Sequence, residues 1–267
     1  MAFAEDLSQW LEQQGIRVSA TRSVSELSEE EDEAFDGLVR ESDLIVVLGG
    51  DGSLLGASRR AAPLEKSILG IHWGTLGFLN ECDPAGARDA FARIFDGDYF
   101  VEERLMLRAQ IWRSGVCCCS CLALNDVAVT RNSLSRILQV EVQIGEETAA
   151  SYRGDGVIIA TPTGSTAHAL SAGGPVLDPR VDALSITPIC PHSLGGRAVV
   201  VPAWERLRIR HHTPHADVSI TLDGQIGMPM QATDLVEVTR APWKARFIRF
   251  GHNQFYPTLR DKLHWKL

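Results

Sequence analysis

The sequence predicts an α/β N-terminal domain with a doubly wound, Rossmann-like sheet, followed by a β-rich domain and a C-terminal helix that returns to the first domain. The apolar run Leu44–Leu48 ends in two glycines, which is typical of a strand in a parallel sheet covered by helices. From about residue 100, apolar and polar residues alternate. Residues 256–265 return to helical spacing. The predicted domains are residues 1–100, 101–245 and 246–267.

The first 100 residues contain two predicted strand-and-helix units. An opening helix over residues 7–14 is predicted from the spacing of its apolar residues, and Gly15 ends it. The acidic stretch 25–33 is expected to be a solvated loop or helix face. Residues 44–48 are predicted to form a strand buried on both faces, followed by a helix over 53–62. A second strand over 68–71 and a second helix over 87–95 complete the domain.

The middle of the chain shows the period of two that strands require. Alternation is clear in residues 105–111, 140–144 and 218–222, and one helical stretch is expected near 165–172. If residues 117–121 form a strand, then Cys117, Cys119 and Cys121 share a face as small buried hydrophobes. A metal site is the less favoured alternative for these cysteines. The group His211, His212 and His215 is expected to lie in a solvated loop between strands rather than to bind a metal.

Composition excludes several classes of function. The 267 residues are 45% hydrophobic and 22% charged, which is ordinary for a globular protein. A formal net charge of -8, without a basic stripe, argues against a nucleic-acid partner. The chain starts without the pattern of a signal peptide, and no apolar run is long enough for a bilayer. The 6 cysteines are not spaced as a disulfide framework, so a cytoplasmic location is expected.

The segment Gly49-Gly50-Asp51-Gly52 is the first candidate site, because it follows the predicted strand at the end where open α/β sheets bind ligands. Glycines allow phosphate to approach the backbone at a helix N-terminus. Asp51 would repel phosphate unless it ligates Mg²⁺ or accepts a proton from an attacking hydroxyl. The structural alternative is that Asp51 caps the next helix. The spacing matches neither of the common phosphate-binding fingerprints.

The second candidate site spans residues 153–175. A predicted strand runs into Thr161-Pro162, and a series of small and hydroxyl-bearing residues follows. Such residues can cap a short helix or donate hydrogen bonds to a ligand, and small side chains let a flat ring lie against the backbone. The structural alternative is a simple turn. The chemistry of these residues alone leaves both interpretations open.

Taken together, the two segments resemble the NAD kinase family. The motif Gly-Gly-Asp-Gly is followed by Asn125-Asp126, then by Asp155-Gly156, and then by the long run from Thr161 to Pro175. Further matches occur in family order to the C-terminus, at residues 77–79, 102–107, 186–192 and 222–225. Gly-Gly-Asp-Gly also occurs in lipid kinases and phosphofructokinases, whereas the long second motif is specific to the family.

The resemblance implies an ATP:NAD 2′-phosphotransferase in which Asp51 accepts the proton of the adenosine ribose 2′-hydroxyl. It implies a phosphate loop of Gly49, Gly50 and Gly52, and a divalent cation such as Mg²⁺ that arrives with ATP, with no fixed protein metal site. A homodimer or homotetramer is also implied. The implied NAD contacts are Asp51, Gly52, Phe78, Asn125, Asp126, Arg136, Arg153, Asp155, Thr163, Thr166, Ala167, His168, Ala169, Leu170, Ser171 and Gln225.

Several positions depart from the family pattern. His168 stands where a tyrosine is usual, so ring stacking can survive but a phenolic hydrogen bond cannot. Gly56 replaces a common arginine, and the family's opening strand before the first helix is not evident. Two rival functions remain: a lipid or sugar kinase that shares only Gly-Gly-Asp-Gly, and an NAD-binding sensor without turnover. Retention of Asp51 argues against the sensor.

Overall fold

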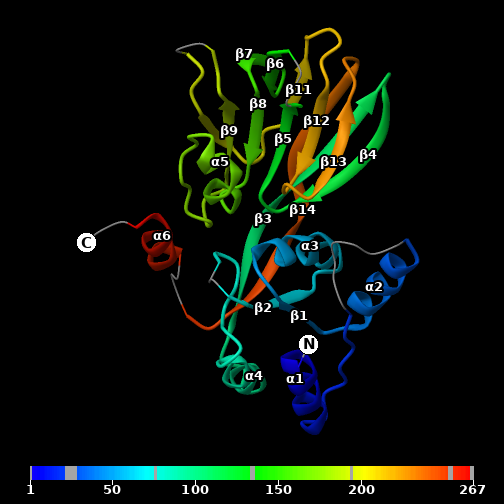
Figure 1. Cartoon of the computed structure of the whole chain (residues 1–267), viewed down its shortest axis with the longest axis vertical. Helices are drawn as coiled ribbons and strands as arrows, with labels where there is room; N and C mark the ends of the chain where they lie inside the picture. Colours follow the sequence, from blue (N-terminus) through cyan, green and yellow to red (C-terminus); the bar gives the residue numbers. More distant parts are fainter. Residues whose placement is uncertain are drawn as a thin grey trace. The chain divides into compact units, whose positions relative to one another are not determined.

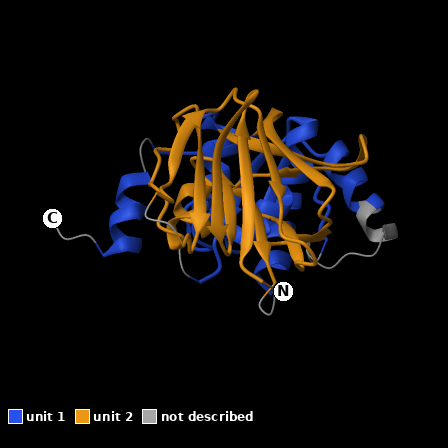
Figure 2. Ribbon diagram, turned by 90° about the horizontal axis from the view of Figure 1, so that it is seen from above, with its two compact units in different colours: residues 1–103, 245–267 blue, residues 104–244 orange. Residues whose placement is uncertain are grey.

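The structure, a computed structural model, describes residues 2–21, 29–74, 77–132, 136–192, 195–251 and 255–264. The chain divides into two compact units, coloured separately in Figure 2. Unit 1 comprises residues 1–103 and 245–267, and unit 2 comprises residues 104–244. Two long strands, β3 (Phe100–Arg113) and β14 (Asp234–Arg249), each belong partly to both units.

Unit 1 is an α/β unit with a parallel sheet. Strand β2 lies between β1 and the end of β14, and both pairings are parallel. Besides its parts of β3 and β14, the unit contains α1 (Ala2–Gln13), α2 (Glu29–Glu41), β1 (Leu44–Leu48), α3 (Asp51–Ala61), the 3-10 helix η1 (Ala62–Leu64), β2 (Ser67–Ile71), α4 (Ala87–Phe95) and α6 (Phe255–Leu263) (Figure 1).

Helices cover both faces of this sheet. Leu69 and Ile71 of β2 share a buried cluster with residues of α1 and α4. Gly70 points to the opposite face because side chains alternate along a strand, and there Leu54 of α3 lies against it. A parallel sheet covered on both faces is the doubly wound arrangement, so the predicted fold class of the N-terminal part is confirmed.

Two details of unit 1 differ from the sequence prediction. Strand β1 is half-buried rather than buried on both faces, and Leu48 is 37% exposed. The reason is its place in the sheet, because among the described strands β1 pairs only with β2. Helix α3 begins at Asp51, two residues earlier than predicted. In the described residues before β1, only the helices α1 and α2 occur, and part of the acidic stretch 25–33 belongs to α2.

Unit 2 is β-rich, as predicted. One sheet has the order β10-β9-β8-β5-β12-β13, and a second contains β11, β6 and β7 with the unit's parts of β3, β4 and β14. A large apolar core is built from residues of both sheets. The elements not yet given are β4 (Val116–Ala123), β5 (Asp126–Arg131), β6 (Leu138–Ile144), β7 (Glu147–Gly154), β8 (Gly156–Ala160), η2 (Gly164–Thr166), α5 (His168–Ser171), β9 (Ala183–Ile189), β10 (Val199–Pro202), β11 (Leu207–His211), β12 (Val218–Leu222) and β13 (Ile226–Met230).

The cysteine-rich stretch forms strand β4, but its cysteines are not all on one buried face. Cys119 and Cys121 pack against the core, whereas Cys117 is exposed. The pairing of β3 with β4 is irregular between Ile111 and Trp112, which pair with Cys119 and Cys117. The extra residue between these partners is a β-bulge, and it interrupts the alternation on which the prediction relied.

The prediction for His211 was also wrong. His211 is the last residue of β11, is only 2% exposed and pairs with Val140, whereas His212 and His215 are exposed as expected. Alternation explains its burial, because His211 lies on the same face of the strand as the buried Leu207 and Ile209. Burial also holds the pKa of His211 below its ordinary value, so the ring is neutral at physiological pH.

Candidate active site

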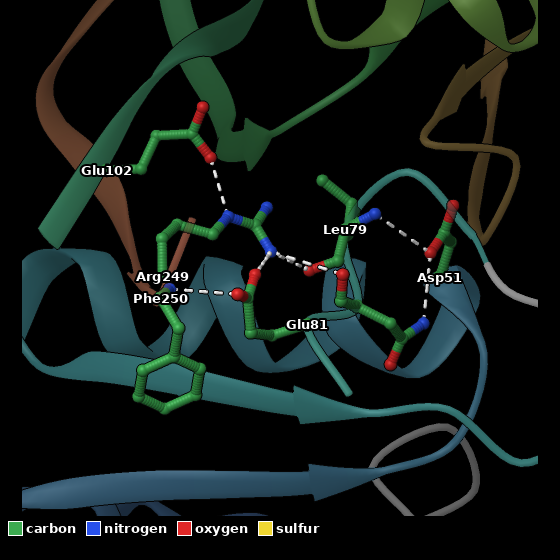
Figure 3. A network of polar contacts seen from close by, with 7 residues as sticks. Asp51, Leu79, Glu81, Glu102, Arg249 and Phe250 are labelled. Atoms are coloured by element: carbon green, nitrogen blue, oxygen red, sulfur yellow. Dashed lines mark hydrogen bonds and ion pairs between the residues drawn. The ribbon is translucent and has the colours of Figure 1, made fainter. Parts of the chain in front are cut away.

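The carboxylate of Asp51 is held in place by a loop from elsewhere in unit 1. Its Oδ2 accepts a hydrogen bond from the backbone N–H of Phe78 at 2.8 Å. Its Oδ1 accepts one from the N–H of Leu79 and one from the side-chain amide of Asn80, each at 3.2 Å. Figure 3 shows the last two bonds. The N-cap of α3 is Gly50, so Asp51 is fixed by this loop rather than serving as the cap.

Gly77 makes this approach possible. A methyl group at Gly77 would overlap the carboxylate of Asp51, so the loop comes this close only because residue 77 has no side chain. Phe78 is half-buried, and its ring lies 6.1 Å from that of Phe255 in α6, measured between centroids. The sequence motif Gly77-Phe78-Leu79 thus provides the donors and the clearance that orient Asp51.

The glycines next to Asp51 leave the backbone accessible. Gly50 and Gly52 are exposed, and Gly49 is partly exposed. They connect the C-terminal end of β1 to the N-terminus of α3, where backbone N–H groups point outward and the helix dipole favours an anion. Gly56, by contrast, is buried in α3, so this position presents nothing to a ligand.

In unit 2, Asn125 and Asp126 are fixed by Asp223, a residue that the sequence did not single out. Asp223 lies in the turn between β12 and β13 with a positive φ of 53°. Its Oδ1 accepts the backbone N–H groups of Asn125 at 2.7 Å and Asp126 at 3.2 Å, and its Oδ2 accepts that of Leu124 at 3.1 Å. The match of residues 222–225 to the family was the available signal, but it drew attention to Gln225, which is exposed.

Asp126 is a buried carboxyl group. It is 2% exposed, and its Oδ1 has no hydrogen-bond partner among the described residues. Burial raises the pKa of Asp126 to about 7, and repulsion from the nearby Asp223 adds to the effect. A buried carboxyl oxygen without a partner is costly to the fold, and such groups are frequent where a ligand supplies the missing hydrogen bond.

We expect Asp126→Asn to stabilise the protein above pH 7. The folded-state pKa lies above that of the unfolded chain, so the folded state holds more protons between pH 4 and 7, and its stability falls as pH rises through that window. The neutral amide of asparagine removes this loss. The free energy of unfolding of the variant, relative to the unaltered protein, should therefore be roughly 1–3 kcal/mol more favourable to the folded state at pH 8 than at pH 4. Urea unfolding of both proteins at the two pH values measures it. A stability difference between them that does not change with pH would contradict the expectation.

The segment after β8 packs directly on Asn125. Thr161 Oγ1 donates to the carbonyl of Leu124 at 2.6 Å and accepts the N–H of Gly164 at 3.0 Å. A methyl group at Gly164 would overlap the carbonyl oxygen of Asn125, which explains the glycine at this position. The Asn125-Asp126 motif and the segment that begins at Thr161 therefore form one local structure.

The predicted NAD-contacting residues of this segment differ in exposure. Thr163 is buried, and its hydroxyl accepts a hydrogen bond from Arg104 at 3.3 Å. Ala169 lies in α5 and is fully buried against Ala128, Ile158 and Ala160, so its side chain packs the helix against these residues. Thr166, Ala167 and Leu170 are partly exposed, and His168 and Ser171 are exposed.

The remaining predicted contacts are charged. Asp155 is paired with Arg131, whose Nε donates to the Oδ1 of Asp155 at 2.7 Å, and no sequence motif predicts this partner. Arg153 in β7 and Arg136 before β6 are both exposed.

Within the described part of the chain, no group of three or more His, Cys, Asp or Glu side chains could hold a metal ion. No described helix has the length and apolar content needed to cross a lipid bilayer.

These features define a class of protein. A glycine turn between a parallel strand and a helix N-terminus, with one oriented carboxylate, suits a kinase that transfers a phosphoryl group to a hydroxyl. Comparison with known families is more specific. Residues 2–99 match the family described as ATP-NAD kinase N-terminal domain, and residues 124–250 match ATP-NAD kinase C-terminal domain.

Relatives of known name agree with these matches. The NAD kinase of Symbiobacterium thermophilum is 45% identical over 84% of this chain and 79% of its own length. The NAD kinase of Heliobacterium modesticaldum is 42% identical over 97% of this chain and 92% of its own. The chain belongs to the NAD kinase family.

Solved structures share the fold. A yeast NADH kinase complexed with NADH superimposes with a TM-score of 0.78 at 26% identity, covering 86% of this chain and 69% of that one. An Archaeoglobus fulgidus NAD kinase in complex with ATP gives a TM-score of 0.79 at 22% identity, with 99% and 95% covered. The second likeness is one of fold alone.

Proposed function

We propose that this protein transfers the γ-phosphoryl group of ATP to the 2′-hydroxyl of the adenosine ribose of NAD, with Asp51 as the general base. The products are NADP and ADP. The role of Asp51 is supported by the position of its carboxylate. Three hydrogen-bond donors of one loop fix this carboxylate beside an exposed glycine turn. Its Oδ2 accepts only one bond from the described residues, so this oxygen has a lone pair for the proton of the attacking hydroxyl.

Phosphoryl transfer depends mainly on positioning and on neutralising charge. We assign the phosphates of ATP to the turn formed by Gly49, Gly50 and Gly52, where the backbone is accessible at a helix N-terminus. Because Mg²⁺ usually binds through substrate phosphates and one or two carboxylates, it needs no dedicated protein cage here. The cation supplies neutralisation of the phosphate charge when it is bound, and the protein supplies the base and the backbone donors.

The residues proposed to contact NAD are those that the family resemblance implies. In unit 1 they are Asp51, Gly52 and Phe78. In unit 2, Asp126 supports the proposal most directly, because none of the described residues provides a hydrogen-bond partner for its buried Oδ1, and a ligand hydroxyl or amine could do so. The other contacts proposed in unit 2 are Asn125, Arg136, Arg153, Asp155, Thr163, Thr166, Ala167, His168, Ala169, Leu170, Ser171 and Gln225.

One assay tests the function against its rivals. The purified protein is incubated with Mg-ATP and NAD, and NADP is measured with an NADP-specific dehydrogenase. We expect NADP to form only when both substrates are present, and we expect no NADP when a chelator removes the cation. NAD binding without NADP formation would support a sensor, whereas phosphorylation of a lipid or sugar without NAD turnover would support the other kinase class. Parallel reactions with polyphosphate and with NADH define the range of donor and acceptor.

We further propose a cytoplasmic homodimer or homotetramer. All six cysteines are thiols in the structure, as is usual for a protein of a reducing compartment. Strand β10 lies at an edge of the six-stranded sheet and exposes Val199 and Val200, and Trp204 just beyond it is also exposed. Apolar residues on a sheet edge are a surface for association between copies. Light scattering during size-exclusion chromatography gives the number of subunits.

A further inference from the structure

Arg249, the last residue of β14, is a buried cation that binds the loop holding Asp51. It is 6% exposed. Its Nη1 donates to the carbonyl oxygens of Leu79 at 2.9 Å and Asn80 at 3.2 Å. Arg249 also pairs with two carboxylates, through Nη1 to Glu81 at 3.1 Å and through Nε to Glu102 at 2.8 Å. One guanidinium therefore ties together the loop, the start of β3 and the end of β14.

Asp51 and Arg249 bind the same two residues from opposite sides. Asp51 accepts hydrogen bonds from the N–H of Leu79 and the side-chain amide of Asn80, while Arg249 donates to the carbonyl oxygens of both residues. Figure 3 shows the guanidinium of Arg249 on one side of Leu79 and the carboxylate of Asp51 on the other. A shift of this segment relative to Arg249 would therefore move the donors that orient Asp51.

Glu81 closes the network. Its side chain is nearly inaccessible, and it accepts the backbone N–H of Phe250 at 2.8 Å in addition to pairing with Arg249. Burial raises the pKa of Glu81, and the bonds from Phe250 and Arg249 act against that rise. A buried carboxylate with two such partners keeps the loop fixed to the end of β14.

We propose that Arg249 is a positioning residue for phosphoryl transfer, acting through residues 79–81 on the carboxylate of Asp51. This inference rests on the role proposed above for Asp51. The planar guanidinium can reach two carbonyl groups and two carboxylates at once, whereas the ammonium of lysine is a point charge with a different geometry. Lysine at this position keeps the charge and loses part of the fixed orientation.

The test compares Arg249→Lys with Arg93→Lys. Arg93 is a matched control in unit 1, because it pairs with Asp98 at 2.6 Å and donates to the carbonyl of Phe250 at 3.0 Å without contacting the loop. We expect Arg249→Lys to lower kcat about 10- to 100-fold, as for a displaced catalytic group, with KM for NAD and ATP changed less than about twofold. Arg93→Lys should leave both constants unchanged. Melting temperatures are measured so that every assay runs on folded protein.

A double mutant separates positioning from general damage. In an Asp51→Asn background the base is gone, so Arg249→Lys should change kcat less than about twofold. An equal loss of kcat in both backgrounds, or no loss in the wild-type background, overturns the inference. Normal turnover by Asp51→Asn alone overturns the proposed role of Asp51 instead.

If Arg249→Lys does not fold, Glu102→Gln is used in its place. This substitution removes the negative charge that pairs with Nε of Arg249, and it leaves the hydrogen bonds from Arg249 to the loop in place. The expected result has the same form, with a smaller loss of kcat that disappears in the Asp51→Asn background. Unchanged kcat in Glu102→Gln, or a loss that persists in that background, contradicts the inference.

Discussion

Asp51→Asn is expected to lower kcat by about 10²–10⁴-fold, the usual contribution of a general base, while the protein remains folded. Asparagine has nearly the same shape but cannot take the proton of the ribose hydroxyl. It also accepts hydrogen bonds through one oxygen only, so at least one of the donors from Phe78, Leu79 and Asn80 loses its acceptor. The measurements are the steady-state rate of NADP formation and the melting temperature.

A matched control for this substitution is Asp6→Asn, which also removes a carboxylate from unit 1. Asp6 forms an exposed ion pair with Arg88, and such pairs contribute little to stability. The kcat of Asp6→Asn should equal that of the unaltered protein. If Asp51→Asn turned over at the normal rate with unchanged KM, another group would have to be the base.

Gly77→Ala is expected to reduce kcat about 100-fold with a modest loss of stability. The added methyl group would overlap the carboxylate of Asp51, and the carboxylate is the end of a short side chain that can rotate away. That rotation gives up the hydrogen bonds from Phe78, Leu79 and Asn80, which contribute about 1 kcal/mol each. A displacement of about 1 Å is enough to reduce a rate 100-fold. Rates and urea unfolding curves of the two proteins measure the two effects separately.

Gly37→Ala serves as the control for adding a methyl group. Gly37 lies within α2, and a side chain there would meet no atom within 4 Å. We expect normal kcat and a slight gain in stability, because alanine favours a helix over glycine. Retention of full activity by Gly77→Ala would show that the orientation of Asp51 seen here does not govern the rate.

Local sequence patterns were sufficient to predict the fold class. The apolar run at β1, the period of two after residue 100 and the helical spacing near the C-terminus all correspond to the observed elements. Exposure was predicted less well, because it depends on neighbours that a local pattern does not contain. Strand β1 lies at a sheet edge, a bulge changes the direction of Cys117, and alternation carries His211 into the core.

The residues that orient the candidate catalytic groups were the least predictable. Asn80 reaches Asp51 across 29 positions of sequence, and Arg249 reaches Asn80 across 169. Asp223 binds the backbone of Asn125 across 98 positions. Asn80 and Arg249 lie outside the matched motifs, and nothing in the local sequence around Arg249 predicts its partners. Only the folded chain shows which groups these side chains bind.

The discontinuity of unit 1 has a consequence for how the protein is made. Strand β2 obtains its second neighbour only from residues 246 and 247, and Arg249 reaches the loop only after that. During synthesis the ribosome must therefore deliver the chain as far as residue 247 before unit 1 can close its sheet. Unit 2 is continuous in sequence and can fold earlier. Orientation of the base is thus completed late, and a nascent chain that stalls before β14 is finished lacks it.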